Sequence, residues 1–270
     1  MAKNRSGGSG LGWIVLIALG FLAFKFRHEL SELGGWREAS APPASVPDAT
    51  ASYARAPLQD SWPPLEQAAA GAPSAARATL NYYVVLDGSG SMRESECGAG
   101  KRKIAAAVTA LEQFVSQVPK EANVGLLVFD DAGISERVPL DQGNHAAVRA
   151  ALQGVRAKGG TPLKSAIAEG YDKLLAQARR QLGYGEYHLV VVTDGKPEPS
   201  DEDPSDLVGT LLATTPVVLH TIGFCIGTDH VLNQPGRSYY VAAESPEQLQ
   251  QGLSAVLAEA PAFDQSQFGD

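Results

Sequence analysis

The sequence of 270 residues contains only two cysteines, Cys97 and Cys225, and it has fewer Lys and Arg than Asp and Glu. Two cysteines are too few for a disulfide-built scaffold, and their wide separation does not fit a zinc knuckle. The formal net charge of −8 argues against nucleic acid as a partner, because phosphate binding requires a basic face. The apolar run near the amino terminus, Leu11–Phe24, is only 14 residues long and falls short of a full membrane span.

That run is nevertheless the candidate membrane anchor. As a helix it spans about 21 Å, less than the roughly 30 Å hydrocarbon layer. Extending it from Gly7 to Phe26, with Lys25 reaching the interface, gives about 30 Å. We therefore predict that residues 1–28 form an uncleaved signal anchor that contacts the membrane through residues 11–26. A cleaved signal peptide and a buried soluble helix remain alternatives.

A linker is predicted from residue 29 to residue 79. Ala, Pro and Ser dominate it, and such a composition cannot bury enough apolar surface to fold. Tyr53 and Trp62 are candidate docking points, although a chance occurrence of aromatic residues is the simpler interpretation. The positive charges on either side of the anchor are nearly balanced and do not decide its orientation. We expect a single-pass membrane protein with a periplasmic domain, and the cytoplasmic orientation stays open.

Residues 80–260 are predicted to form one α/β domain, followed by a frayed tail over residues 261–270. Apolar stretches typical of strands buried on both faces recur between amphipathic helical stretches. This order predicts a doubly wound, mostly parallel central sheet flanked by helices. We expect strands at 82–86, 123–129, 135–140, 188–193, 216–224 and 238–243, the second and third forming a hairpin. We expect helices at 103–118, 145–155, 162–182, 207–214 and 246–259.

Oxygen-bearing side chains follow the ends of predicted strands. Asp87, Ser89 and Ser91 come directly after the first apolar stretch, and glycines between them allow a tight turn. Thr161 lies in a Gly-Gly-Thr-Pro turn, and Asp194 follows the apolar stretch HLVVVT. Each has an ordinary explanation as a turn or capping residue. Because ligands bind at the carboxyl ends of parallel strands, we expect the five to converge there. Their oxygens suit a hard cation such as Mg²⁺.

This pattern resembles the von Willebrand factor A domain family and its metal-ion-dependent adhesion site. The matching blocks are VVLDGSGSM, GGTPL, VVVTDGKP and HTIGF, and the likeness extends over residues 80–259. The resemblance, to a membrane-anchored bacterial type, implies a bound divalent cation, usually Mg²⁺ but also Mn²⁺ or Ca²⁺. It further implies that the two serines and the threonine hold the cation, with the aspartates binding directly or through water. One coordination position would remain for a carboxylate of a partner protein.

The two cysteines are both predicted near this edge of the sheet. Cys97 lies in the loop after the first strand, and Cys225 directly follows the strand predicted at 216–224. A disulfide between them would hold the loop that carries Ser91. Two independent thiols are equally consistent with the sequence. A disulfide would place the domain outside the cytoplasm.

The enzymatic interpretations fail on the residues present. Gly88–Met92 does not match the Gly-x-Ser-x-Gly nucleophile elbow, and Gly98–Arg102 departs from a phosphate-binding loop. His230 can approach the site from its loop, but no acid/base pair stands out. We therefore expect neither catalysis nor a small-molecule substrate. The acidic stretch from Glu198 to Asp206 is interpreted as a solvated loop, with a contribution to holding the cation as the alternative.

The function predicted from the sequence is metal-dependent binding of a protein partner that offers a carboxylate. The alternative is a structural or accessory subunit of a larger membrane-associated or ATPase-linked assembly, in which the metal only stabilises the domain. Asp130 and Asp131 at the end of the second strand, or the linker, would then supply contacts.

Overall fold

The structure is a computed structural model, and it describes residues 62–64 and 79–258. The predicted anchor at residues 1–28, the predicted membrane contact at 11–26 and the predicted tail at 261–270 lie outside the described residues, as does most of the linker. Within the two described ranges, no helix combines the length and the apolar character needed to cross a bilayer.

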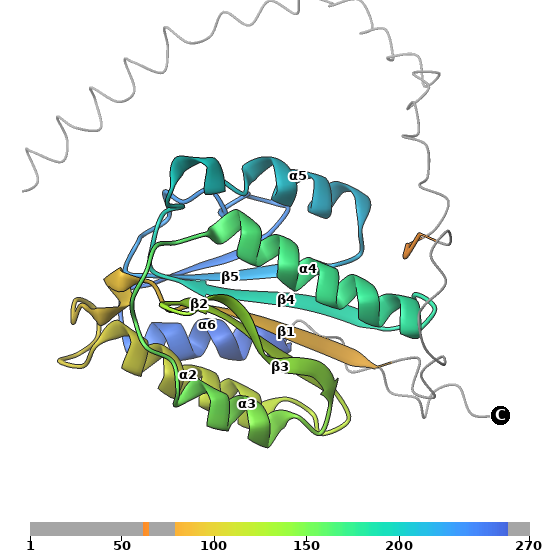
Figure 1. The fold of residues 1–270 in the computed structure, drawn as a ribbon, viewed down its shortest axis with the longest axis horizontal. Coiled ribbons are helices and arrows are strands. Elements are labelled where there is room, and N and C mark those ends of the chain that lie inside the picture. The colour runs from red at the N-terminus through yellow and green to blue at the C-terminus, as the bar shows by residue number, and fades with distance from the viewer. Residues whose placement is uncertain (1–61, 65–78, 259–270) are drawn as a thin grey trace, which may run out of the picture. The chain divides into compact units, whose positions relative to one another are not determined.

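A six-stranded sheet with the order β3-β2-β1-β4-β5-β6 forms the centre of the domain (Figure 1). Neighbouring strands run parallel, except that β2 and β3 are antiparallel. The predicted mostly parallel sheet and the predicted hairpin are thus confirmed. The strands are β1 (Leu80–Asp87), β2 (Asn123–Asp130), β3 (Gly133–Gln142), β4 (Glu186–Thr193), β5 (Val218–Phe224) and β6 (Tyr239–Ala243).

Helices cover both faces of the sheet, with α2, α3 and α6 on one face and α4 and α5 on the other (Figure 1). Successive side chains of β1 point to opposite faces, so Tyr82 and Val84 join the core under α2, whereas Tyr83 and Val85 join the core under α4. Burial on both sides explains why the strand is apolar throughout. The helices are α2 (Lys103–Gln117), α3 (His145–Leu152), α4 (Leu163–Arg180), α5 (Ser205–Thr214) and α6 (Pro246–Ala258), with short 3-10 turns at Gly90–Arg93 and Ser200–Glu202.

Several helix ends differ from the predicted ends by two or three residues. α4 ends at Arg180 because the next residues leave the helical region: Leu182 has a φ of 55° and Gly183 a φ of 80°. The Gly183 N–H then donates to the Ala178 carbonyl at 2.8 Å, which closes the helix end. α3 ends at Leu152, three residues before its predicted end. Apolar periodicity continues past these ends, so it does not locate them.

Trp62 is half-buried against the domain, which the composition of the linker did not predict. Its ring lies 4.9 Å from that of Tyr187 in an edge-on arrangement, and its Nε1–H donates to the Tyr171 hydroxyl at 3.3 Å. The interpretation of this aromatic residue as a chance occurrence is therefore wrong. Tyr187 lies at the start of β4, so the contact is at the amino edge of the sheet.

A column of stacked rings crosses four strands on the face that α2 and α6 cover. Tyr82, His188, His220 and Tyr239 follow one another with ring centroids 4.8, 5.4 and 5.2 Å apart. His188 Nδ1 and His220 Nε2 are 3.1 Å apart, and Glu186 is the charged group nearest the pair, 3.5 Å from His188 Nε2. Burial lowers the pKa of His188 to about 4, and burial together with His188 lowers the pKa of His220 to about 3. Both rings are therefore neutral near pH 7.

We expect the free energy of unfolding to fall as the pH drops below about 6.5, the ordinary pKa of histidine. In the unfolded chain both imidazoles bind protons in this range, whereas in the folded domain His188 and His220 stay neutral down to about pH 4. Asp87 offsets part of the loss. Its pKa in the folded domain is raised to about 6, so as the pH falls the folded domain takes up a proton at this carboxyl before the unfolded chain does, which favours the folded state. Taken together, the two histidines and Asp87 should account for a loss of about 2 kcal/mol between pH 7 and pH 5.

Urea unfolding at the two pH values, in EDTA, measures this loss. The His188→Gln/His220→Gln double variant should lose less stability over the same interval, because it lacks both buried rings. His145→Gln is the control, since His145 is only half-buried at the start of α3 and is not part of the ring column, and it should behave like the parent. An unchanged pH dependence in the double variant would contradict the assignment.

Candidate metal centre

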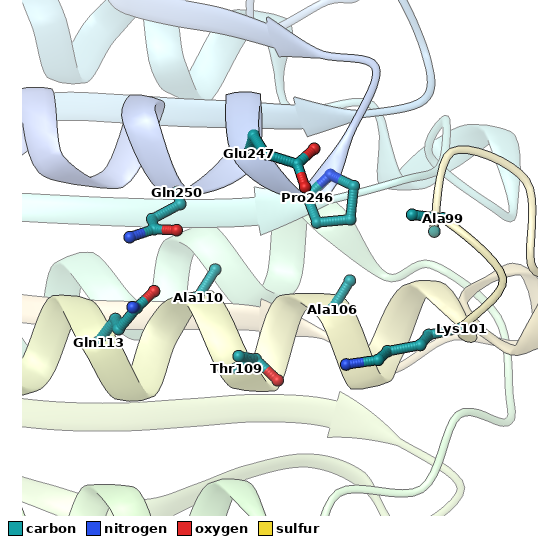
Figure 2. Close-up of a pocket in the computed structure, with 10 residues that line it drawn as sticks. Ala99, Lys101, Ala106, Thr109, Ala110, Gln113, Pro246, Glu247 and Gln250 are labelled. Carbon is teal, nitrogen blue, oxygen red and sulfur yellow. The ribbon is translucent and has the colours of Figure 1, made fainter.

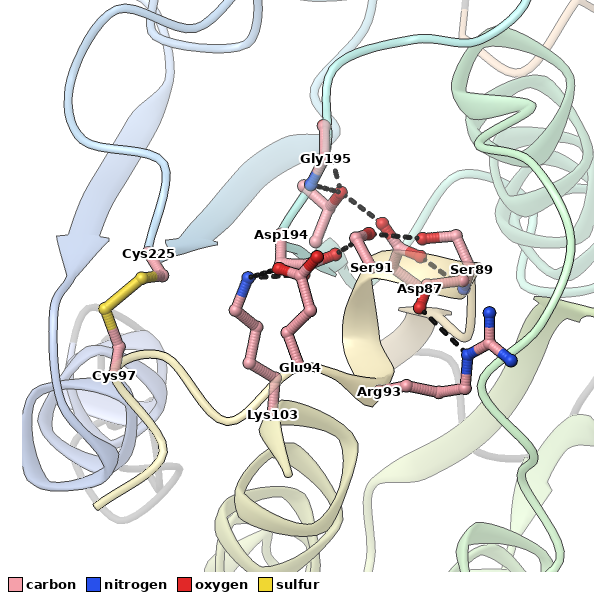
Figure 3. A network of polar contacts seen from close by, with 12 residues as sticks. Asp87, Ser89, Ser91, Arg93, Glu94, Cys97, Lys103, Asp194, Gly195 and Cys225 are labelled. Atoms are coloured by element: carbon pink, nitrogen blue, oxygen red, sulfur yellow. Dashed lines mark hydrogen bonds and ion pairs between the residues drawn. A yellow bond between two sulfur atoms is a disulfide. The ribbon is translucent and has the colours of Figure 1, made fainter. Parts of the chain in front are cut away.

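Three loops at the carboxyl edge of the sheet bring the five predicted site residues together, and Figure 3 labels four of them, Asp87, Ser89, Ser91 and Asp194. Asp87 is the last residue of β1, and Asp194 directly follows β4, the neighbouring strand. Thr161 comes from the loop between α3 and α4. Ser91 is partly buried, whereas the other four residues are almost fully buried.

Backbone hydrogen bonds tie these loops to one another. The Gly88 N–H donates to a carbonyl near the end of β2 at 2.8 Å, and the Gly90 N–H donates to the Gly159 carbonyl at 3.0 Å. Thr161 in turn exchanges two backbone hydrogen bonds with Glu198 of the third loop, at 3.2 and 3.0 Å. A Cβ on Gly88 would lie 2.9 Å from that β2 carbonyl oxygen, so only glycine permits this approach.

The hydroxyls of Ser89 and Ser91 connect the two aspartates in one network (Figure 3). The Ser89 backbone N–H donates to Asp87 Oδ1 at 2.7 Å, and the two serine Oγ atoms are 3.0 Å apart. Ser91 Oγ donates to Asp194 Oδ1 at 2.7 Å. Carboxylates from two adjacent strands are thus joined through neutral hydroxyls.

Thr193, the last residue of β4, is a member of this network that sequence reasoning missed, although it stands inside the VVVTDGKP block. Its hydroxyl donates to Asp87 Oδ2 at 2.6 Å and accepts the Gly195 N–H at 3.2 Å. Burial raises the pKa of Asp87 to about 6, even though hydrogen bonds from Ser89 and Thr193 favour the ionised form; the Asp194 charge raises it further. A positive charge nearby would therefore stabilise ionised Asp87.

Thr161 offers a free oxygen next to these carboxylates. Its side chain is buried, yet its hydroxyl makes no hydrogen bond within the part of the chain that the structure describes. A Cβ placed on Gly195 would lie 3.2 Å from Thr161 Oγ1 and 3.8 Å from Asp87 Oδ2, so both oxygens border the space beside this glycine. The hydroxyl is thus available as a ligand and, beside a buried carboxylate, it fits a hard cation.

Lys103, the first residue of α2, is the second member that sequence reasoning missed. Its side chain is only 4% exposed, and its Nζ lies 3.0 Å from Asp194 Oδ2 and 3.2 Å from Glu94 Oε2 (Figure 3). Burial opposes its charge, but the hydrogen bonds and attraction of Asp194 and then Glu94 outweigh burial and raise the pKa of Lys103. A charged residue at a helix start is expected to face solvent, so the pattern alone gave no signal.

The other candidate carboxylates are engaged elsewhere. Asp130 accepts two hydrogen bonds from Arg137, at 2.8 and 2.9 Å, and Asp131 lies 3.5 Å from Lys158 Nζ. Glu202, in the stretch expected to be a solvated loop, accepts a backbone N–H from the first turn of α4 at 2.8 Å. These groups serve ion pairs and a helix start.

His230 contacts the rim of the site, as its loop position allowed. Its Nδ1 accepts the Leu232 N–H at 3.2 Å, so its Nε2 carries the proton and donates to the Gly195 carbonyl at 3.1 Å. Burial lowers the pKa of His230. The ring thus braces the loop after β4 in its neutral form.

Cys97 and Cys225 are joined by a disulfide that connects the loop after β1 to the end of β5 (Figure 3). The Cys225 N–H also donates to the Ala243 carbonyl at the end of β6 at 2.8 Å. Both cysteines have positive φ angles, 54° and 63°, in a region that non-glycine residues rarely occupy. The bond therefore holds two rim loops in a conformation that the residues alone disfavour.

The same loop borders a pocket of about 170 Å³ between α2 and α6 (Figure 2). Ala106 and Ala110 line it from α2, and Gly98 lines it from the disulfide-bonded loop. Lys101 and Glu247 supply its charged groups. None of the five predicted site residues lines this pocket, so it is separate from the candidate metal centre.

Replacing both cysteines with serine should lower the free energy of unfolding by about 2–5 kcal/mol, because the bond closes a loop of 128 residues. Urea unfolding measures the loss. A reductant should destabilise the parent by a similar amount and leave the Cys97→Ser/Cys225→Ser variant unchanged. Free thiols in the unreduced parent, found by thiol labelling, would disprove the pairing.

Residues 81–251 match the family model of the von Willebrand factor type A domain. The match covers more than half of the chain, so the chain belongs to this family. The resemblance seen in the sequence is thereby confirmed for the fold and the family.

Curated proteins similar to part of the chain include the following two. The collagen alpha-2(VI) chain of Gallus gallus is 27% identical over 180 residues, which are 63% of this chain and 17% of that protein. Uncharacterized protein sll0103 of Synechocystis sp. is 28% identical over 148 residues, 55% of this chain and 33% of that protein. The chain therefore spans a third or less of the length of these relatives.

Solved structures share the fold at low sequence identity, which supports the fold alone. The pilus adhesin SpaC from Lactobacillus rhamnosus GG has a TM-score of 0.53 and 17% identity, covering 68% of this chain and 31% of that chain. Proximal thread matrix protein 1 from the mussel byssus, with a zinc-occupied MIDAS motif, has a TM-score of 0.53 and 17% identity (67% and 47% covered). Manganese-loaded TRAP protein from Plasmodium vivax has a TM-score of 0.50 and 16% identity (67% and 74%).

Proposed function

We propose that this domain is a divalent-cation-dependent module for binding proteins. Ser89, Ser91 and Thr161 hold the cation through their hydroxyls, and Asp87 and Asp194 bind it directly or through water. The observation that carries the proposal is the convergence of these five side chains at one edge of the sheet, with the Thr161 hydroxyl lacking an internal partner among the described residues.

The proposed cation is Mg²⁺, or another hard divalent ion such as Mn²⁺ or Ca²⁺. All five donors are oxygens, which suit hard cations. The zinc- and manganese-bearing relatives support a divalent cation in general. When bound, the ion supplies a Lewis acid to which a carboxylate of the partner protein coordinates.

The donor set also supports a carboxylate as the partner's ligand. Three of the five donors are neutral hydroxyls, and Lys103 already pairs with Asp194. The protein therefore does not fully neutralise the cation, and an acidic side chain from outside completes the site. The adhesin SpaC is a relative whose name describes attachment, which agrees with a binding role.

We propose no catalytic role, no small-molecule substrate and no nucleic-acid partner. The serine hydroxyls bond to each other and to Asp194 and have no histidine base. His230 donates to a backbone carbonyl, and the pair His188 and His220 is buried beneath helices. Neither serine hydroxyl of the site therefore has a histidine in hydrogen-bonding reach among the described residues.

The proposed setting is the periplasmic side of a membrane, to which residues 11–26 anchor the chain. The apolar character of that segment and the disulfide between Cys97 and Cys225 support this setting, because disulfides persist in oxidising compartments. Trp62 and β1 begin the domain at the amino edge of the sheet, opposite the five donors. A tether at that edge leaves the candidate site free to meet a partner.

Thr161→Ala should weaken Mg²⁺ binding by about tenfold or more while leaving the domain folded, because the hydroxyl makes no internal hydrogen bond that the fold needs. Isothermal titration of Mg²⁺ measures the affinity, and circular dichroism checks the fold. Thr109→Ala is the matched control, since Thr109 is exposed and only donates to a carbonyl of its own helix. Equal affinity in Thr161→Ala and Thr109→Ala would remove Thr161 from the site.

A blocked peptide with one glutamate should bind the parent only when Mg²⁺ is present, and EDTA should abolish the binding. Asp87→Ala should lose both Mg²⁺ and the peptide, because it removes the buried carboxylate at the centre of the network. Titrations with the glutamine counterpart of the peptide supply the control. Metal binding without peptide binding would instead favour the structural or accessory role, in which the cation only stabilises the domain.

A further inference from the structure

We propose that Lys103 sets the ligand preference of this site by cancelling one of its two buried negative charges. A bound divalent cation then keeps a net positive charge, and an incoming carboxylate neutralises it. The inference rests on the proposed function, because it concerns the same cation and the same class of partner. It assigns the preference for a carboxylate ligand to Lys103, a residue that contacts neither the cation nor the partner.

The geometry shows a buried ammonium committed to one aspartate. Lys103 Nζ lies 3.0 Å from Asp194 Oδ2, and the two side chains are 4% and 0% exposed. Its second partner, Glu94, is 61% exposed and is therefore screened by solvent. The other oxygen of Asp194 accepts the Ser91 hydroxyl, so Lys103 and Ser91 fix this carboxylate from two sides (Figure 3).

The buried charges around the site can be counted from these contacts. Asp87 and Asp194 contribute two negative charges, and Lys103 contributes one positive charge. The two charges on the rim, Arg93 and Glu94, are exposed and therefore screened by solvent, and Asp130 is bound to Arg137. The protein therefore offers a divalent cation a net charge of minus one.

With Lys103 in place, the loaded site carries a net charge of plus one, which favours a carboxylate as the last ligand. Without Lys103, two aspartates would neutralise a divalent cation completely, and a neutral ligand such as water would suffice. The ammonium thus weakens the hold on the cation and strengthens the attraction for an acidic partner. Electrostatic effects of this kind are large where side chains are buried.

A neutral hydrogen-bond donor would orient Asp194 without this effect. Burying an ammonium has a substantial desolvation cost, so a lysine is a poor choice where only orientation is needed. Lys103 is therefore a positioning residue with an electrostatic role, and its removal should change two affinities in opposite directions. A merely structural residue would change both in the same direction or change neither.

The test uses the full chain in four forms: the parent, Lys103→Met, Lys103→Arg and Glu94→Gln. Isothermal titration measures Mg²⁺ affinity. Nuclear magnetic resonance titration of the Mg²⁺-saturated protein with a blocked single-glutamate peptide measures carboxylate affinity. Lys103→Met should bind Mg²⁺ about tenfold more tightly and the peptide about tenfold more weakly, as expected for one unit charge removed at short range. Lys103→Arg keeps the charge and should resemble the parent.

Glu94→Gln is the matched control, because it removes the exposed partner of the same ammonium and should change either affinity by less than about threefold. If Lys103→Met changes both affinities in the same direction, or changes neither, the inference is wrong. If that variant does not fold without metal, Lys103→Gln takes its place, because it keeps a hydrogen-bond donor for Asp194 without the charge. It should show the same two opposite changes, and unchanged affinities or changes in one direction would overturn the inference.

Binding of Mg²⁺ and of the peptide by the parent protein tests the proposed function independently of Lys103. A parent that binds Mg²⁺ and then the peptide supports the function, and the variants alone then decide the role of Lys103. A parent that binds no divalent cation overturns both.

Discussion

The domain depends on the complete burial of one carboxylate, that of Asp87, at the end of the central strand. β1 is covered on both faces and flanked by β2 and β4, so water cannot solvate the charge where the strand ends. Each oxygen must therefore find a donor within the protein. One donor comes from the loop that follows, through Ser89, and the other from the adjacent strand, through Thr193. Satisfying a single charge thus fixes the loop after β1 against the end of β4.

Much of the fold was predictable because its main signal is local. Stretches such as HLVVVT lack polar alternation, and only burial on both faces accommodates them, which implies a parallel sheet covered by helices. The convergence of Asp87, Thr161 and Asp194 followed from the same premise, since the carboxyl ends of parallel strands share an edge. Helix ends were less predictable, because left-handed residues such as Leu182 stop α4 inside a stretch that still has apolar periodicity.

What the sequence did not reveal involves side chains that reach across elements. Lys103 belongs to the first turn of a helix by its periodicity, but its long side chain extends to Asp194, 91 residues away in sequence. Thr193 looked like an ordinary strand residue because its role depends on its register with β1. Trp62 lies in a segment whose composition is typical of a linker. Its packing role depends on Tyr187, which is distant in sequence and close only in the folded domain. The sequence could not decide whether Cys97 and Cys225 form a disulfide, because loop length does not determine whether two Cα atoms come within 5.9 Å.

The hydrogen bonds among the site residues have a consequence for the order of events in the life of the protein. All four oxygens of Asp87 and Asp194 already have donors from the chain itself: a backbone amide, two hydroxyls and the ammonium of Lys103. The polypeptide can therefore reach its native arrangement before any cation arrives, unlike small domains that are unfolded without their metal. Under the proposed function, cation loading would then be a later and reversible event, and its extent would follow the concentration of the ion in the surrounding compartment.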